Sequence, residues 1–133
     1  MNYVFSEMTF MTETKGLTHW FLANDGTSLW AWNLVRNTSQ LLLEEAATVI
    51  AMAVDPVKGY LFLADSSTVR RYTFVVDLGL DYMSPKITLG HRNSVVVFRD
   101  ENINSLTVDQ DHSILYMGSQ AGITALNYTP EIA

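Results

Sequence analysis

One pattern of apolar runs and polar turns constrains this chain more than any other feature, because it occurs three times. Its clearest copy is VIAMAVDPVKGYLFLADSSTVRRYTF, residues 49–74. A first apolar run ends in an Asp-Pro-x-Lys-Gly turn, a second run ends in a short polar turn, and a third run follows. Apolar runs of this length between turn residues are typical of buried strands. The pattern therefore predicts a meander of antiparallel strands.

The other two copies keep the same internal spacing. A stretch near the C-terminus repeats the pattern at a constant offset of 54, so that Asp109 matches Asp55 and Tyr116 matches Phe62. Upstream, Phe21 matches Phe62 at an offset of 41. In each copy the residue that ends the first strand lies 10 positions before the residue that ends the second. A fixed period of this kind indicates structural units that stack on one another.

Each copy predicts the same three strands, and two copies predict a fourth. Four antiparallel strands in about 40 residues are typical of a β-propeller blade. We therefore expect an all-β fold of about three blades, which is half of a six-bladed ring. The expected strands are 8–13, 18–23, 28–34 and 39–45 in the first copy, 49–54, 60–64, 68–75 and 93–100 in the second, and 103–108, 114–118 and 122–128 in the third.

The whole chain is expected to form a single partial β-propeller domain, residues 1–133. Three blades cannot close a propeller, because at least four are needed. Two arrangements stay open. Either a longer parent propeller supplies the remaining blades, or two copies join head to tail as a homodimer, each donating residues 3–5 to the last blade of the other. The repeats run approximately over 7–45, 46–100 and 101–133, with residues 1–6 as a spare outer strand.

The second copy resembles the repeats of six-bladed propellers of the LDL-receptor class B, or YWTD, type, and it is similar to NHL repeats. Both families carry an apolar-Ala-Val-Asp strand, a turn, an aromatic-x-x-Asp strand and then an Ile or Val strand. The YWTD tetrad maps onto 62–65, 116–119 and 21–24, with its Trp and Thr absent throughout and its Asp present only at Asp65. Receptor propellers of the sevenless and Ros type are similarly degenerate, and this chain resembles them too.

The resemblance implies that the tetrad residues are structural. In such families the Asp carboxylate ties blades together, and an Asp or Asn at the end of a strand can satisfy the N–H groups of the following turn. We therefore expect structural repeat residues rather than catalytic ones at Asp55, Asp65, Asp109, Phe21, Phe62 and Tyr116.

The third strands of the copies also align. Trp32 aligns with Tyr72 and Leu126, which predicts a core position between neighbouring blades. Trp30 aligns with Arg70, and is also expected to pack. Arg70 and Arg71 form a lone basic pair, which we expect on a solvated face of the strand.

Composition limits the partners of this chain. Hydrophobic residues make up 48% and charged residues 17% of the sequence, which favours a folded domain over a disordered one. A net charge of −6 repels phosphate groups, so no nucleic acid and no anionic membrane is expected as a partner. No apolar run is long enough for direct membrane insertion. There is no cysteine, so disulfides and thiolate chemistry are excluded.

Two N-x-Ser/Thr sequons, at Asn37 and Asn127, are possible glycosylation sites. Together with the receptor resemblance they favour an extracellular or cell-surface location, as part of a longer chain. A cytoplasmic scaffold of the NHL type is the alternative.

The sequence carries no catalytic motif. The three histidines, His19, His91 and His112, share no metal-type spacing, and no nucleophile elbow or phosphate-binding loop is present. No cofactor is expected; the acidic stretches 99–105 and 109–111 leave calcium open as the one candidate metal. The chain is therefore expected to be no enzyme. A lactonase-like propeller hydrolase with a central metal is the alternative.

The leading hypothesis is a non-catalytic module that binds a protein ligand through loops on one face. Such loops often carry binding residues. The first candidate is the insertion 77–92, which separates the third and fourth strands of the second copy. The turns 55–59 and 109–113 are the next candidates. In that insertion the expected ligand-face loop residues are Asp81, Tyr82, Met83, His91 and Arg92.

Overall fold

The structure, a computed structural model, is built from β-strands. It describes residues 7–10, 20–24, 28–33, 37–44, 49–65, 67–77, 86–99 and 102–129, and within these ranges there is no helix. The all-β prediction is therefore confirmed. The strands are β1 (Glu7–Phe10), β2 (Trp20–Asn24), β3 (Leu29–Asn33), β4 (Thr38–Leu43), β5 (Ala51–Asp55), β6 (Tyr60–Ala64), β7 (Thr68–Asp77), β8 (Lys86–Arg99), β9 (Ser105–Asp109), β10 (Ile114–Ser119) and β11 (Gly122–Asn127).

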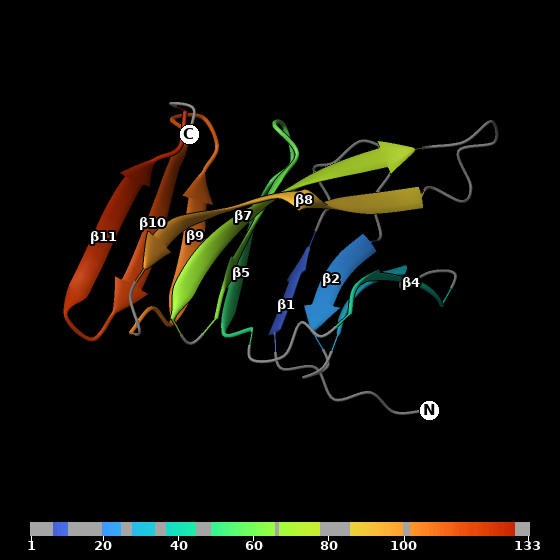
Figure 1. Ribbon diagram of the computed structural model, residues 1–133, viewed down its shortest axis with the longest axis horizontal. Helices are drawn as coiled ribbons and strands as arrows, with labels where there is room; N and C mark the ends of the chain where they lie inside the picture. Colours follow the sequence, from blue (N-terminus) through green and yellow to red (C-terminus); the bar gives the residue numbers. More distant parts are fainter. Residues whose placement is uncertain are drawn as a thin grey trace.

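The strands form three antiparallel sheets, and within each sheet neighbours in the chain are neighbours in space (Figure 1). Sheet 1 contains β1 to β4, sheet 2 contains β5 to β8, and sheet 3 contains β9 to β11. Figure 1 shows sheet 2 between the other two, with sheet 3 at the left end of the stack and sheet 1 at the right. The first strands of the three sheets, β1, β5 and β9, contact one another in that order. This is the arrangement expected of successive blades.

The 54-residue offset between the second and third copies is reproduced by the backbone. Asp55 pairs with Tyr60 as Asp109 pairs with Ile114. The turns after these aspartates both place their last residue at positive φ, Gly59 at 73° and Ser113 at 55°. Each of these residues then accepts a hydrogen bond from a residue 15 positions on, Phe74 N at 2.8 Å and Tyr128 N at 2.9 Å. The second and third copies of the sequence repeat therefore also share a backbone hydrogen bond at equivalent positions.

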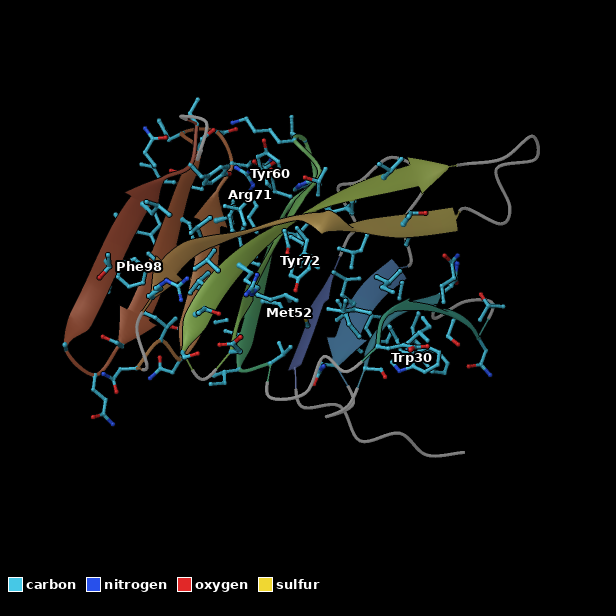
Figure 2. All side chains as sticks on the ribbon, viewed as in Figure 1. Trp30, Met52, Tyr60, Arg71, Tyr72 and Phe98 are labelled. Atoms are coloured by element: carbon cyan, nitrogen blue, oxygen red, sulfur yellow. The ribbon has the colours of Figure 1, made fainter. Side chains whose placement is uncertain are left out.

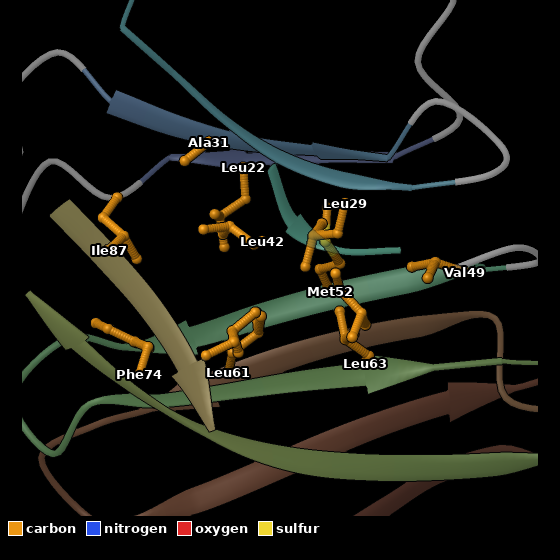
Figure 3. Packing of buried hydrophobic residues seen from close by; sticks show 12 residues of the cluster. Leu22, Leu29, Ala31, Leu42, Val49, Met52, Leu61, Leu63, Phe74 and Ile87 are labelled. Carbon is orange, nitrogen blue, oxygen red and sulfur yellow. The ribbon is translucent and has the colours of Figure 1, made fainter. Parts of the chain in front are cut away.

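Two apolar layers hold the stack together. Between sheets 1 and 2 the buried side chains include Leu22, Leu29, Met52 and Leu61 (Figure 3). Between sheets 2 and 3 they include Ala51, Ala53, Phe62, Ala64, Val69, Leu115 and Met117. Each sheet therefore buries apolar side chains against a neighbour, which a single sheet could not do alone.

The first copy is out of step with the predicted alignment by one residue in β2. Leu22, rather than Phe21, lies on the face of sheet 1 that packs against sheet 2. Phe21 pairs with Trp32 and projects to the other face, because successive side chains of a strand alternate. The predicted match of Phe21 with Phe62 is therefore wrong, since Phe62 lies in the layer between sheets 2 and 3.

The same alternation locates the tryptophans. Leu29 and Ala31 pack toward sheet 2, so Trp30 and Trp32 lie on the face of sheet 1 that turns away from it, where both are half-buried. Tyr72, which the sequence aligns with Trp32, does pack between sheets 1 and 2, and Leu126 packs between sheets 2 and 3.

The insertion of the second copy is in part strand, not loop. β7 continues to Asp77 and β8 begins at Lys86, so the two form a long hairpin with irregular register between Arg71 and Thr73. Its outer half extends over sheet 1, where Ile87 and Leu89 are buried and Ile87 N donates to Gln40 Oε1 at 2.9 Å. The expectation of a loop at His91 and Arg92 is therefore wrong. Both lie within β8, in the irregular segment between Gly90, which pairs with Thr73, and Val95, which pairs with Arg71.

Other predictions lie outside the described residues. These include the spare outer strand 1–6, the segment 3–5, and the loop residues Asp81, Tyr82 and Met83. Within the part of the chain that the structure describes, no helix is long and apolar enough to cross a membrane.

The repeated turn offers a direct test of the fold. A Cβ at Gly59, where φ is 73°, would stand 3.0 Å from the carbonyl oxygen of Phe74. We expect Gly59→Ala to lower the free energy of unfolding by about 1–2 kcal/mol, because both backbone strain and a backbone contact oppose the methyl group. Chemical denaturation measures this. Val57→Ala is the control in the same turn, because Val57 is 80% exposed. Equal stabilities of the two variants would contradict the turn geometry.

Candidate binding rim between the second and third sheets

Two of the predicted contact turns meet at one end of the stack. Lys58 Nζ, in the turn between β5 and β6, donates a hydrogen bond to Ser113 Oγ, in the turn between β9 and β10. Tyr128, which follows β11, lies against both turns and donates its backbone N–H to Ser113 O. We call this group the rim, and it consists of Asp55, Lys58, Tyr60, Arg71, Ser113 and Tyr128.

Asp55 is the buried anchor of the rim. Its side chain is fully buried, and its Oδ1 accepts hydrogen bonds from the backbone N–H groups of Val57 and Lys58, both at 3.0 Å. Its Oδ2 accepts a hydrogen bond of 2.6 Å from the hydroxyl of Tyr128. A buried carboxylate is costly unless it is hydrogen-bonded, and here three donors converge on it. Asp55 therefore fixes the turn of sheet 2 and links it to sheet 3.

Tyr128 is held in its neutral form. Burial raises the pKa of its phenol far above the usual value, and the hydrogen bond to Asp55 and the negative charge of that carboxylate raise the pKa further. The protonated hydroxyl is the form that can donate to Asp55. At neutral pH the pair is therefore a structural hydrogen bond and offers no free base.

Aromatic rings and cations alternate along the rim. Lys58 Nζ lies 5.3 Å from the ring centroid of Tyr128, and Arg71 Cζ lies 4.5 Å from the centroid of Tyr60. The two tyrosine rings meet edge to face at 6.0 Å, and Phe62 packs against Tyr128 at 5.0 Å. Figure 2 shows Arg71 beside Tyr60 at this end of sheet 2. Both cations are within the range of a cation–π interaction, so their positions are fixed before any ligand arrives.

The outer edge of the rim is accessible. Lys58 is exposed, and the neighbouring Val57 is 80% exposed, whereas Tyr60 and Arg71 are half-buried. The rim thus presents two positive charges, aromatic edges and one apolar side chain on a chain whose net charge is −6. Such a surface can bind a carboxylate together with apolar groups.

The equivalent aspartate of the third copy has a different environment. Asp109 Oδ2 lies 2.9 Å from His112 Nδ1, within hydrogen-bond distance, and Asp109 Oδ1 accepts from His112 N at 3.4 Å. The side chains of Asp109 and His112 are 37% and 73% exposed, respectively. Asp109 therefore closes its own turn without the interaction with a second sheet that Asp55 makes.

The residues at the end of each second strand bond within their own turns. Asp65 Oδ1 accepts from the backbone N–H groups of Ser67 and Thr68, both at 2.8 Å. Burial acts to raise the pKa of Asp65, but these hydrogen bonds, a further one from the Thr68 hydroxyl and the positive charge of Arg70 outweigh it and lower the pKa overall. In the third copy Ser119 Oγ likewise accepts from Ala121 N at 3.2 Å, whereas in the first copy Asn24 Nδ2 donates to Ser28 O at 3.2 Å.

The structure separates the remaining predicted residues. Phe62 is fully buried between sheets 2 and 3, whereas its counterpart Tyr116 is 37% exposed on the outer face of sheet 3. Asn37 precedes β4 and Asn127 ends β11, and both are exposed.

Three rim residues, Tyr60, Arg71 and Tyr128, lie outside the turns that the sequence predicts as contact turns. Arg71 was expected to belong to a solvated basic pair, although its neighbour Arg70 projects to the opposite face of sheet 2. Tyr60 and Tyr128 were predicted only as strand residues, whereas Lys58 and Ser113 lie in the predicted contact turns 55–59 and 109–113. The available signal was the repeat, because Tyr128 takes the place of Phe74 and adds a hydroxyl opposite Asp55.

Among the described residues, no group of three or more His, Asp or Glu side chains could hold a metal ion. No protein-family model matches the chain, and no curated protein matches it. Function is therefore inferred from the geometry of the rim.

The bond between Tyr128 and Asp55 predicts an alkaline weakness. We expect Tyr128→Phe to lower the free energy of unfolding by about 1–3 kcal/mol at pH 7, because it leaves a buried carboxylate oxygen without its donor. The raised pKa of Tyr128 stabilises the fold fully below the pKa of an unfolded tyrosine, about 10, and this contribution is lost as the pH rises above it.

Urea denaturation between pH 7 and 11 measures both effects. The stability difference between the original chain and Tyr128→Phe should be constant up to about pH 9 and should shrink above about pH 10. Tyr116→Phe is the control, because Tyr116 is 37% exposed. A difference that does not change with pH would contradict the proposed ionisation behaviour of Tyr128.

Proposed function

We propose that this chain is a non-catalytic protein-binding module, built from propeller-type blades and belonging to an extracellular receptor-type β-propeller. The observation that carries the proposal is the rim, where two cations lie on tyrosine rings beside an exposed valine. Arg and Tyr are enriched among the residues that dominate binding energy at protein interfaces.

The acidic groups near the rim support binding rather than catalysis. Asp55 is buried and has three hydrogen-bond donors, and the phenol of Tyr128 is held protonated. Asp109 is paired with His112 in an exposed turn. A general acid or base must reach a substrate and titrate near the working pH. The interactions of Asp55 and Tyr128 instead hold the two sheets together.

The rim also suggests the chemistry of the partner. Lys58 and Arg71 favour a segment with at least one carboxylate, and Val57 and Tyr60 favour an apolar side chain beside it. Because the cations are already stacked on aromatic rings, little side-chain entropy remains to be lost on binding. The partner is therefore proposed to be a protein segment that carries acidic and apolar residues together.

Peptide selection tests the rim. Peptides selected from a random phage-displayed library on the folded chain should be rich in Asp or Glu beside apolar residues. Their affinity should fall about tenfold or more for Arg71→Ala and for Lys58→Ala, because each variant removes a charge from the rim. Fluorescence anisotropy with the selected peptides measures this.

Arg99→Ala is the control for peptide binding. Arg99 ends β8, is exposed and pairs with Thr68, at the end of sheet 2 opposite to the turn that carries Lys58. We expect this variant to bind the selected peptides as the original chain does. Peptides whose affinity is equal for all three variants would overturn the rim as the binding site.

The sequons test the proposed location. Asn37, Thr38 and Ser39 are all exposed, so an oligosaccharide can be accommodated there without disturbing the core. In a secretory host we expect the chain to carry a glycan that Asn37→Gln removes, with mass spectrometry as the readout. Asn127→Gln provides the comparison, since Asn127 Oδ1 already accepts a hydrogen bond from Thr129 N. Secretion with Asn37 fully unmodified would count against the extracellular assignment.

A further inference from the structure

The interface between sheets 2 and 3 joins a face of small residues to a face of large ones. The small-residue face of sheet 2 carries Ala51, Ala53 and Ala64 around Phe62. The large-residue face of sheet 3 fills the space that the alanines leave, and it carries Leu106, Val108, Leu115 and Met117. Close packing of this kind needs large side chains opposite small ones.

Sheet 3 has a small-residue face of its own, on the side away from sheet 2. At the offset of 54, Ser105, Thr107 and Gly118 take the places of Ala51, Ala53 and Ala64. Tyr116 and Ile123 take the places of Phe62 and Val69. The strand register places these residues on one face, because Gly118 pairs with Ser105 and Ile123, and Tyr116 pairs with Thr107 and Ala125.

The same positions differ sharply in exposure. Phe62 and Val69 are 0% exposed, whereas Tyr116 is 37% and Ile123 is 78% exposed. Ser105, Thr107 and Ala125 are exposed as well, and the centre of this face carries no charged side chain. At Gly118 a Cβ would stand 2.2 Å from Ser105 Oγ, so a larger residue there would require the exposed Ser105 side chain to rotate. Association through the centre of this face would therefore bury no charge, although the hydroxyl groups of Ser105, Thr107 and Tyr116 would need hydrogen-bond partners in the interface.

The opposite end of the stack presents large residues. Trp30, Trp32 and Leu41 lie on the face of sheet 1 that turns away from sheet 2, where Leu41, which pairs with Trp30, is 43% exposed, the two tryptophans are half-buried and Phe21 is buried. Figure 2 shows Trp30 at this end of the molecule, away from sheet 3. Trp32 occupies the place that Tyr72 and Leu126 have in the two internal interfaces.

We propose that the chain associates with a second copy of itself, head to tail, through the small-residue face of sheet 3 and the face of sheet 1 that carries Trp30, Trp32 and Leu41. This contact would continue the stack in the same way as the interface that the molecule already makes between sheets 2 and 3. Two copies would contribute six sheets, within the range in which such stacks close into rings. This proposal is independent of peptide binding at the rim.

Solution mass and two substitutions test the contact. The mass of the original chain should approach twice 14.9 kDa in light scattering after size exclusion. The experiment is run across a dilution series at about 0.15 M salt, where repulsion between the acidic chains is screened. Thr107→Arg on sheet 3 and Leu41→Glu on sheet 1 should each weaken association about tenfold or more, because each buries a charge in the interface.

Mixing the two variants distinguishes head-to-tail contact from other modes. A mixed dimer has one unchanged interface, because both substitutions fall in the other, whereas a dimer of either variant alone has a substitution in each interface. Mixing should therefore restore the dimer. Val57→Arg, in an exposed turn outside both faces, should leave the mass unchanged. Circular dichroism confirms that the variants keep their strands.

Three results would overturn the proposal. They are a monomer at every concentration, a dimer that ignores Thr107→Arg, and a dimer that Thr107→Arg abolishes while Leu41→Glu does not. The last would indicate sheet 3 packing on sheet 3 through a two-fold axis. An open polymer that both substitutions dissolve would support the same contact without ring closure.

Discussion

The fold depends on the burial of apolar side chains between neighbouring sheets, and between sheets 2 and 3 large side chains of one sheet fill the space above small residues of the other. No single meander here can bury both of its faces, and a lone three- or four-stranded sheet has too little core to be stable. Leu115 and Met117 lie over Ala51, Ala53 and Ala64, and all five are buried in one layer. Because the same positions recur in each copy, the packing that joins two sheets also specifies where the next sheet would be placed.

The polar contacts at the rim fix the alignment of sheets 2 and 3. Apolar layers tolerate sliding, whereas the hydroxyl of Tyr128 reaches the carboxylate of Asp55 only in one alignment of the two sheets. The contact between Lys58 and Ser113 joins the two turns on the same side. The interactions that fix this alignment also hold Lys58 and Arg71 on their tyrosine rings, so the proposed binding surface is a consequence of how the sheets are aligned.

The two proposed surfaces lie on different parts of the molecule. The rim is at the turns between strands, where side chains of two sheets meet, and the small-residue face is at the end of the stack. A rim is polar and preorganised, which suits selective binding. A flat face of uncharged small residues suits packing against another sheet. One repeat therefore supplies both kinds of surface, because its turns and its faces have separate roles.

The sequence by itself determined the strands and their order. The 54-residue offset located the second and third copies to the residue, since turn chemistry at Asp55 and Asp109 recurs with the same hydrogen bonds. The predicted alignment of the first copy is wrong by one residue at Phe21, because apolar residues lie on both faces of β2. An apolar run without alternation does not indicate which of its side chains face the next sheet. The sequence also assigned a loop to residues that extend β8, since the pairing of that segment with β7 is a contact between strands.

Only the tertiary structure decided the site. Asp55 and Tyr128 are separated by 73 positions, and no local pattern indicates that a hydroxyl and a buried carboxylate will meet. Arg70 and Arg71 look alike in the sequence, yet strand alternation and the stacking of sheets send one to each face. Local propensity and periodicity determine elements, whereas the meeting of distant side chains depends on how whole sheets pack, which is a property of the assembled molecule.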